Sequence, residues 1–257
     1  MGNIVSIHSF RGGTGKSNVV ANLAANLALQ GFRVGIVDTD IQSPGIHVLF
    51  GLDVKQVTYT LNDYLLGRCA VEDAAFDVSQ SLAQGGEKMA DAGGVIYLIP
   101  ASMKVNEITK VLSEGYDVGR LTQGYEQLGD RLRLDYLLID THPGINEETL
   151  LSMGISNTLV VILRPDYQDY QGTALTVKVA KELDIPNIML VVNKVLPDFD
   201  VADIRQQMQT TYDVPVAAVL PLYDEMMRLG SRSIFSLQYP QHPLTHALIA
   251  LATQLKP

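Results

Sequence analysis

Strand-length apolar runs alternate with longer helix-like stretches along almost the whole chain, and this alternation limits the folds that the chain can adopt. Residues 159–163 (Leu-Val-Val-Ile-Leu) and 188–192 (Ile-Met-Leu-Val-Val) are apolar without interruption. Such runs occur when helices cover both faces of a parallel sheet. The predicted strands span residues 3–8, 33–38, 95–99, 134–140, 158–163, 188–193 and 214–220. We therefore expect an α/β fold, with a single open, mostly parallel sheet flanked by helices on both faces.

The segments between these strands predict helices and show no break between domains. The helices are expected at residues 16–30, with Gly31 as the stop, and at 116–131, 146–154, 170–183, 200–211, 224–230 and 243–254. Hydrophobic residues make up 47% of the chain, which is enough for a large core. We therefore expect residues 1–257 to form one domain. Residues 77–94 are rich in Gln, Ser and Gly and predict a flexible surface loop.

Charge and cysteine content exclude several classes of protein. The 28 acidic and 19 basic side chains give a net charge of −9, which disfavours nucleic-acid binding over a broad surface but leaves a local basic patch open. One cysteine, Cys69, excludes an internal disulfide or a multi-thiolate zinc site. It also disfavours an iron–sulfur cluster, unless subunits share one. No apolar run approaches about 18 residues and the first residues lack signal-peptide features, so we expect a cytoplasmic location.

A glycine-rich loop, residues 9–17 (Ser-Phe-Arg-Gly-Gly-Thr-Gly-Lys-Ser), joins the first predicted strand to the first helix. Its glycines allow backbone N–H groups to turn around phosphate oxygens, and the helix N-terminus adds partial positive charge. Lys16 is expected to reach the β- and γ-phosphates, and Ser17 to offer a hydroxyl to Mg²⁺. Phe10 replaces the first glycine of the G-x-x-x-x-G-K-[ST] template. The position between strand and helix nevertheless favours phosphate binding over a plain turn.

Two acidic segments follow later predicted strands. Asp38 and Asp40 stand at the end of the second strand, and Asp140 ends an apolar strand. An Asp-x-Asp pair can serve a metal-bound water and an attacking water separately, although turn and capping chemistry is the alternative. A single Asp at a strand tip is what a Walker-B aspartate requires to hold Mg²⁺ or its waters. Gly144 follows closely and is a candidate switch residue for the γ-phosphate.

Together these segments resemble the MinD/ParA family of deviant Walker-A P-loop ATPases, of the SIMIBI class, and the resemblance covers almost the whole chain. The family's loop, Lys-Gly-Gly-x-Gly-Lys-[Ser/Thr], is matched by residues 11–17, with Arg11 in place of the signature lysine. The family's Asp-Thr-Pro-Pro-Gly segment is matched by residues 140–144, with His142 in place of a proline. Residues 192–194, 220–224 and 239–244 also look like the family. The fold that this resemblance implies is that of a P-loop NTPase.

The resemblance implies that two subunits close over two Mg-ATP molecules and that hydrolysis releases the dimer. Such a switch would control the positioning, partitioning or regulation of a cellular component. The implied catalytic residues are Arg11, Lys16 and Asp40, with Asp40 orienting the lytic water and Arg11 able to act as an arginine finger. The implied Mg²⁺ shell is Ser17, Asp38 and Asp140. The implied contacts to ATP or ADP are Gly12, Gly13, Thr14, Gly15, Lys16, Ser17, Asn18, Asn193, Pro221 and Tyr223, with Asn193 reading the adenine.

The choice of adenine also follows from the residues themselves. Guanine specificity in related folds commonly uses Asn-Lys-x-Asp, in which the carboxylate accepts hydrogen bonds from the base. Residues 193–196 read Asn-Lys-Val-Leu, so that Leu196 stands where the Asp would be. ATP is therefore favoured over GTP.

The resemblance implies a homodimer and a protein activator or cargo adaptor as partners. The C-terminal stretch, residues 247–257, carries a single lysine, so direct membrane binding is disfavoured. DNA binding stays open without support, because isolated arginines such as Arg205, Arg228 and Arg232 usually form a solvated face. Two other functions remain as alternatives: an ATP-dependent enzyme or maturation factor acting on a small substrate, and a nucleotide-binding scaffold with little hydrolysis.

Overall fold

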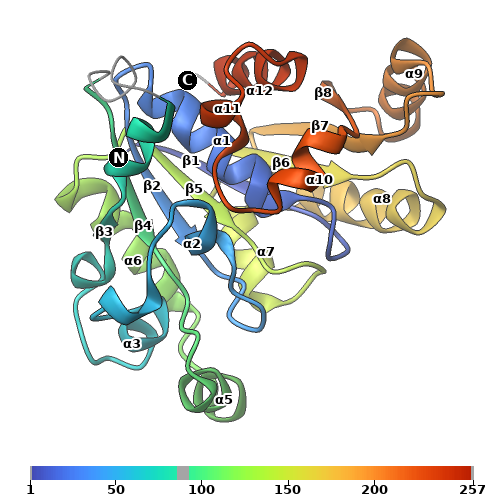
Figure 1. Cartoon of the computed structure of the whole chain (residues 1–257). Helices are drawn as coiled ribbons and strands as arrows, with labels where there is room; N and C mark the ends of the chain where they lie inside the picture. The colour runs from blue at the N-terminus through green and yellow to red at the C-terminus, as the bar shows by residue number, and fades with distance from the viewer. Residues whose placement is uncertain (1, 86–92, 256–257) are drawn as a thin grey trace.

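The computed structural model describes residues 2–85 and 93–255, and within them one sheet of eight strands organises the fold (Figure 1). The strand order is β3-β4-β2-β5-β1-β6-β7-β8. All neighbouring strands are parallel except β3 and β4, which are antiparallel. The strands are β1 (Asn3–His8), β2 (Arg33–Asp38), β3 (Phe76–Asp77), β4 (Val95–Ile99), β5 (Tyr136–Asp140), β6 (Thr158–Leu163), β7 (Asn187–Val195) and β8 (Val216–Pro221). The predicted fold class is confirmed.

Helices cover both faces of this sheet. On one face, α1 (Lys16–Ala28), α11 (Phe235–Gln238) and α12 (Pro243–Gln254) pack with side chains from every parallel strand in one apolar cluster. On the other face, α3 (Leu61–Leu65) and α6 (Gly119–Arg131) pack against β2, β4 and β5. Over β6, β7 and β8 lie α7 (Glu147–Gly154), α8 (Tyr167–Glu182) and α9 (Val201–Tyr212). This double cover explains why the strands read as continuous apolar runs.

Local sequence signals place several helix ends. Asp166 and Asp200 cap α8 and α9 by accepting hydrogen bonds from backbone N–H groups of the first turn. Reciprocal capping boxes begin α3 at Thr60 and α7 at Asn146. Gly31, with φ of +92°, takes the left-handed conformation just after α1. No helix in residues 2–85 or 93–255 has both the length and the apolar character needed to cross a bilayer.

The structure also contains elements that the sequence did not predict. They are the short helices α2 (Ile46–Leu49), α3 and α11, the longer α5 (Val105–Glu114), the 3-10 turns η1 (Val54–Gln56) and η2 (Glu72–Ala74), and β3. The helix α10 (Asp224–Leu229) was expected.

The predicted flexible loop at residues 77–94 differs from the structure in its first half. Asp77 belongs to β3, and the 3-10 helix η3 (Ser79–Gly85) follows it. Val78 and Leu82 are 2% exposed and pack in the cluster around α1 and α11. Two apolar anchors therefore hold a segment whose composition alone resembled a surface loop. Residues 86–92 lie outside the described residues.

Candidate nucleotide site

The strand order brings three sequence-distant loops to one edge of the sheet. β1 lies next to β5, and β5 lies next to β2, so the carboxyl ends of these strands are adjacent. In register, Asp140 pairs with Ile7 on one side and with Asp38 on the other. The glycine-rich loop, the Asp38–Asp40 segment and the segment after Asp140 consequently meet beyond the strand ends. This is where open parallel sheets bind ligands.

The glycine-rich loop leads directly into α1. Gly13 and Gly15 have φ of +76° and +97°, a conformation that glycine adopts at little cost. Lys16 is only 7% exposed, although a lysine is rarely buried without a partner. Thr14 is 1% exposed and its Oγ1 has no hydrogen-bond partner in the described structure. No side chain caps α1, so the first N–H groups of the helix remain available to an anion.

Two residues at the end of β7 support the outer side of this loop. Asn193 Nδ2 donates to the Thr14 carbonyl at 2.8 Å, and Lys194 Nζ donates to the Gly13 carbonyl at 2.7 Å. A Cβ at Gly15 would lie 2.6 Å from Asn193 Nδ2, so glycine is needed for this contact. These bonds occupy loop carbonyls and leave its N–H groups free for phosphate oxygens.

Asp38 and Asp140 form the acidic side of the site. Asp38 is fully buried and accepts hydrogen bonds from the Asp40 N–H at 3.1 Å and the Gly45 N–H at 3.4 Å. Asp140 is 2% exposed, and its Oδ1 has no partner within the described residues. Burial raises the pKa of Asp140 to about 6, although nearby Lys16 and a hydrogen bond from Ser17 oppose the shift. Burial and the charge of Asp140 also raise the pKa of Asp38 well above its usual value.

These carboxylates, together with the Ser17 hydroxyl, fit a hard divalent cation. A cation would pair with the unpartnered Asp140 oxygen and offset the burial of two acidic groups. Across residues 2–85 and 93–255, no cluster of three or more His, Cys, Asp or Glu side chains is arranged to hold a metal by itself. Further ligands would therefore have to come from water or phosphate oxygens, as is usual for Mg²⁺.

Asp40 lies beside the loop that follows β5. Its Oδ1 accepts hydrogen bonds from the Ser43 N–H at 3.1 Å and the Ser43 hydroxyl at 3.0 Å, and His142 Nε2 lies 3.8 Å away. Gly144, at φ of +86°, donates its N–H to the Ser9 carbonyl at 3.1 Å. The segment after Asp140 is thus attached both to Asp40 and to the start of the glycine-rich loop.

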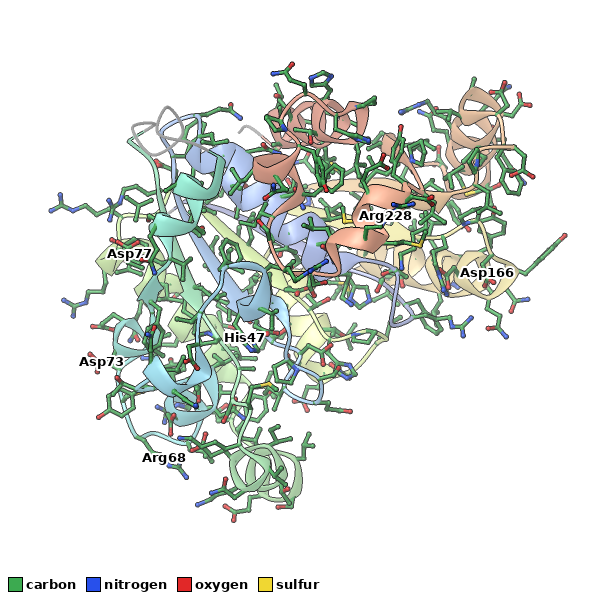
Figure 2. All side chains as sticks on the ribbon, in the orientation of Figure 1. His47, Arg68, Asp73, Asp77, Asp166 and Arg228 are labelled. Carbon is green, nitrogen blue, oxygen red and sulfur yellow. The ribbon has the colours of Figure 1, made fainter. Side chains whose placement is uncertain are left out.

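The Arg11 side chain contacts the start of α8. Its guanidinium donates a hydrogen bond to Gln168 Oε1 and lies 3.6 Å from Asp166 Oδ1 at the start of α8. Figure 2 shows Asp166 at that end of the helix. The substitution of arginine for the family's lysine therefore comes with two acceptors on α8.

Phe10 is accommodated by a glycine on the same helix. A Cβ at Gly172 would lie 2.1 Å from Phe10 Cδ1 and 2.6 Å from Phe10 Cβ, so the ring rests directly on the bare backbone of α8. Phe10 does not adopt a positive φ. The departure from the Walker template consequently introduces no backbone strain at this position.

A cavity of about 490 Å³, here called the base cavity, adjoins the loop. Gly15, Asn18, Asn193, Pro221 and Tyr223 line it, so the structure brings five of the predicted nucleotide residues together. Tyr223 packs edge-on against His242, with ring centroids 4.6 Å apart. One N–H of the Asn193 amide already donates to the Thr14 carbonyl. The contact of Asn193 with adenine therefore stays a prediction.

Sequence reasoning missed several residues of the site. Asn22, Met226, Met227, Leu244 and Leu248 also line the base cavity, but on helices their spacing resembles ordinary core packing. His8, at the end of β1, is fully buried and its Nδ1 lies 2.8 Å from Thr141 Oγ1. Burial, with the charge of Lys16, lowers the pKa of His8 to about 3, so the ring is neutral. No local motif marks it.

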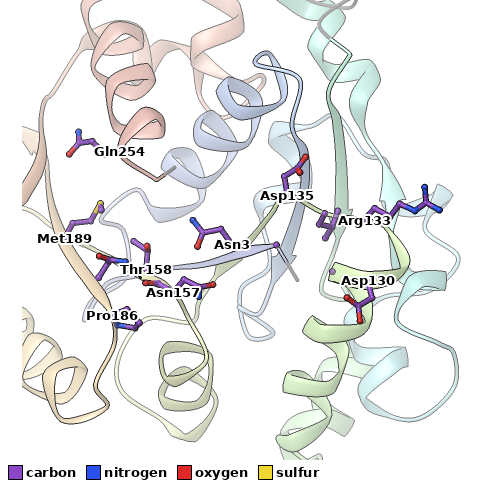
Figure 3. Close-up of a pocket in the computed structure, with 13 residues that line it drawn as sticks. Asn3, Asp130, Arg133, Asp135, Asn157, Thr158, Pro186, Met189 and Gln254 are labelled. Carbon is purple, nitrogen blue, oxygen red and sulfur yellow. Dashed lines mark hydrogen bonds between the residues drawn. The ribbon is translucent and has the colours of Figure 1, made fainter. Parts of the chain in front are cut away.

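A larger cavity, of about 930 Å³, lies at the opposite edge of the sheet (Figure 3). It is lined by the first residues of three strands, Asn3, Thr158 and Asn187. None of the predicted site residues lines it. The chemistry that the sequence predicts therefore belongs to the carboxyl edge, not to this cavity.

Comparison with known proteins agrees with this geometry. Residues 5–237 match the family model described as the CobQ/CobB/MinD/ParA nucleotide binding domain. MinD from Pyrococcus horikoshii, solved as a complex with Mg-ADP, superposes with a TM-score of 0.78 at 26% identity, over 99% of this chain and 96% of that one. An uncharacterized ATP-binding protein of Methanocaldococcus jannaschii is 26% identical over 252 residues, 98% of this chain and 86% of that protein.

A further relative has a different described role. An iron–sulfur cluster carrier protein of Methanocaldococcus jannaschii is 30% identical over 194 residues, which are 74% of this chain and 59% of that protein. The family model, in contrast, spans most of this chain and includes all the loops that meet at the carboxyl edge. This chain therefore belongs to the CobQ/CobB/MinD/ParA nucleotide-binding family and is an ATPase of the MinD/ParA type.

Proposed function

We propose that this protein is a Mg²⁺-dependent ATPase that acts as an ATP-gated dimerisation switch and controls the position, partitioning or regulation of another component. The observation that carries the proposal is the meeting of the glycine-rich loop with the buried, partly unpartnered Asp140 carboxylate. A nucleotide-sized cavity lies directly beside them. The Mg-ADP complex of the Pyrococcus horikoshii relative supports the same ligand here.

Binding of the triphosphate would fall to the loop. Lys16 and the N–H groups of residues 12–17 bind the β- and γ-phosphates, and the start of α1 adds its partial positive charge. Ser17, Asp38 and Asp140 would hold Mg²⁺ and its waters. When bound, Mg²⁺ neutralises charge on the phosphate oxygens. The base cavity takes adenine, since Leu196 offers no carboxylate to guanine.

Hydrolysis requires a positioned water more than a strong base. Asp40 is suited to this role because the two donors of Ser43 fix one carboxylate oxygen. Arg11 would leave its acceptors on α8 to reach the phosphates bound by the second subunit. The contacts with Gln168 and Asp166 oppose this movement of the Arg11 side chain. We therefore expect ATP turnover to be slow until a partner protein stimulates it.

Phosphate release and gel filtration test the proposal. Multiple-turnover release of phosphate from Mg-ATP should be lost in Lys16→Ala and retained in Lys178→Ala, which changes an exposed lysine of α8. The Asp40→Ala protein should elute as a dimer with Mg-ATP and as a monomer without it. Equal turnover in the two lysine variants, or a monomer at saturating Mg-ATP, would refute the ATPase and the switch respectively. Tighter binding of GTP than of ATP would refute the choice of base.

An iron–sulfur carrier function does not fit this chain. The chain has one cysteine, Cys69, whereas clusters usually need four thiolates. Burial, with the charges of Asp63 and Asp73, raises the pKa of the Cys69 thiol to about 11, which opposes the thiolate form that a metal needs.

A further inference from the structure

A second cavity at the carboxyl edge, of about 310 Å³, is not used by the proposed function. We call it the β4 cavity, because residues 100–104, which follow β4, form one wall. The other walls come from His47 of α2, Lys55 of η1, and Val57 and Thr60 before α3. Its volume is at the lower end of small-molecule sites, which span about 300–1,000 Å³.

Three polar residues of the lining are buried, His47, Thr60 and Ser102, and His47 is the one with an unpartnered side-chain atom in the described structure. Its exposure is 5%, and Nδ1 has no hydrogen-bond partner within the described residues. Figure 2 shows His47 at α2, on the side that faces α5. Burial lowers the pKa of His47, so the ring is neutral near pH 7 and one of its nitrogens carries a proton. Native proteins seldom leave a buried polar atom unpaired, and a ligand would supply the missing partner.

Cations line the β4 cavity and carboxylates do not. Lys55 and Lys104 are the two charged residues of the lining. Lys104 Nζ is 3.2 Å from Glu107 Oε1, whereas the Lys55 ammonium has no ion pair within the described part of the chain. The nearest carboxylate along the chain, Asp53, accepts the backbone N–H of Lys55 at 2.9 Å. In a protein with a net charge of −9, this local arrangement favours an anion.

The remaining surface of the cavity is largely apolar. Val57, Pro100, Ala101 and Met103 contribute to it. The other polar groups are already engaged: the Thr60 hydroxyl donates to Asp63, and the Ser102 hydroxyl donates to Glu107. A free inorganic ion would leave the apolar surface uncovered, whereas an organic anion would cover it.

We propose that the β4 cavity binds a small organic anion. Its carboxylate or phosphate group lies between Lys55 and His47, and its apolar body packs against Val57, Pro100 and Met103. The site differs from the nucleotide site but is close to it in the chain. Gly45, two residues before His47, donates its N–H to Asp38 Oδ2 at 3.4 Å. An effect of the bound anion on ATP turnover would rest on the proposed function. Binding of the anion to the β4 cavity does not rest on it.

The test uses the full-length Lys16→Ala protein, so that phosphate probes do not occupy the glycine-rich loop. Histidine ring signals are followed by NMR during titration with phenyl phosphate, benzoate or inorganic phosphate. His47→Gln assigns the His47 signal. We expect phenyl phosphate or benzoate to shift this signal. The probe that binds more tightly shows whether the site prefers a phosphate or a carboxylate group. Lys55→Gln should weaken binding about tenfold, the loss expected for one charged hydrogen bond, while Lys178→Gln should leave it unchanged.

Three results would overturn the proposal. The first is the absence of any His47 shift with either organic probe at millimolar concentration. The second is equal affinity in the Lys55→Gln and Lys178→Gln proteins. The third is binding of inorganic phosphate as tight as that of phenyl phosphate, since the apolar walls would then contribute nothing. Lys55 is exposed, so its substitution should not disturb folding. If the unsubstituted protein failed to bind ATP, the proposed function would be refuted, but the three titration results would keep the same meaning for the β4 cavity.

Discussion

Replacing Gly172 by alanine tests how the chain accommodates Phe10 in its glycine-rich loop. Gly172 is buried within α8, where alanine alone would stabilise the helix by about 1 kcal/mol. The new Cβ, however, would lie 2.1 Å from Phe10 Cδ1, 2.3 Å from Cγ and 2.6 Å from Cβ. Rotation of the ring cannot relieve the last contact, because Cβ is fixed to the loop backbone. The loop or the helix must move.

The expected magnitude follows from two opposing contributions. Overpacking a core costs about 1–3 kcal/mol, and the short contact to Phe10 Cβ argues for the upper end. Subtracting about 1 kcal/mol for helix propensity leaves a net loss of about 2 kcal/mol for Gly172→Ala. In a Phe10→Gly background the obstacle is absent, so the same substitution should stabilise the protein by about 1 kcal/mol. The coupling energy between the two positions is then about 3 kcal/mol.

Urea unfolding of the four proteins in this cycle, followed by circular dichroism, measures the coupling directly. Gly172→Ala should lower the free energy of unfolding when Phe10 is present and raise it in the Phe10→Gly background. If alanine stabilises the protein while Phe10 is present, or if its effect is the same in both backgrounds, then Phe10 does not rest on Gly172. The double variant also carries the glycine of the Walker template. If it binds ATP more tightly than the Gly172→Ala protein does, then the contact between Phe10 and residue 172 sets the shape of the loop.

Three further predictions concern single side chains. Gln168→Ala removes an acceptor of Arg11 and should increase ATP-dependent dimer formation by about 2- to 10-fold, the value of one hydrogen bond; gel filtration across ATP concentrations would show no change if the contact is irrelevant. Folded His8 stays neutral as pH falls below 6.5 while the unfolded chain takes up a proton, so stability should drop by up to about 1.4 kcal/mol per pH unit. His8→Gln should flatten this slope in urea unfolding, and parallel slopes would contradict the assignment. Gly15→Ala, at φ of +97°, should cost at least about 1–2 kcal/mol, whereas Gly12→Ala, whose nearest neighbour is 3.9 Å away, should be close to neutral; equal thermal shifts would argue against a strained loop.

Much of the fold was accessible from the sequence because its signals are local. Seven strands and seven helices were predicted near their observed places, since each combines an apolar run with a turn or capping signal. The short elements α2, α3 and α11 were missed because a few residues carry no periodicity. Residues 78 and 82 look unremarkable in a polar stretch, yet contacts with α1 and α11 bury them.

Some residues of the candidate site also follow from local sequence signals, whereas others depend on contacts between distant parts of the chain. The glycine-rich loop, the Asp-x-Asp segment and the Asp140 segment are contiguous motifs whose chemistry depends on backbone conformation and residue type. In contrast, the contacts of Arg11 with Gln168, and of Phe10 with Gly172, join residues separated by more than half the chain. The walls of the base cavity and the β4 cavity likewise come from several elements.

The sequence by itself determined the class of fold, the glycine-rich loop between β1 and α1, and the acidic residues at the strand ends, because neighbours along the chain specify each of these. The tertiary structure alone decided the strand order that places Asp38 beside Asp140, the burial that makes His8 neutral, and the contacts that hold Arg11 and Phe10 on α8. Burial and long-range contact depend on how elements pack, and packing sums many weak interactions that no short stretch of sequence contains.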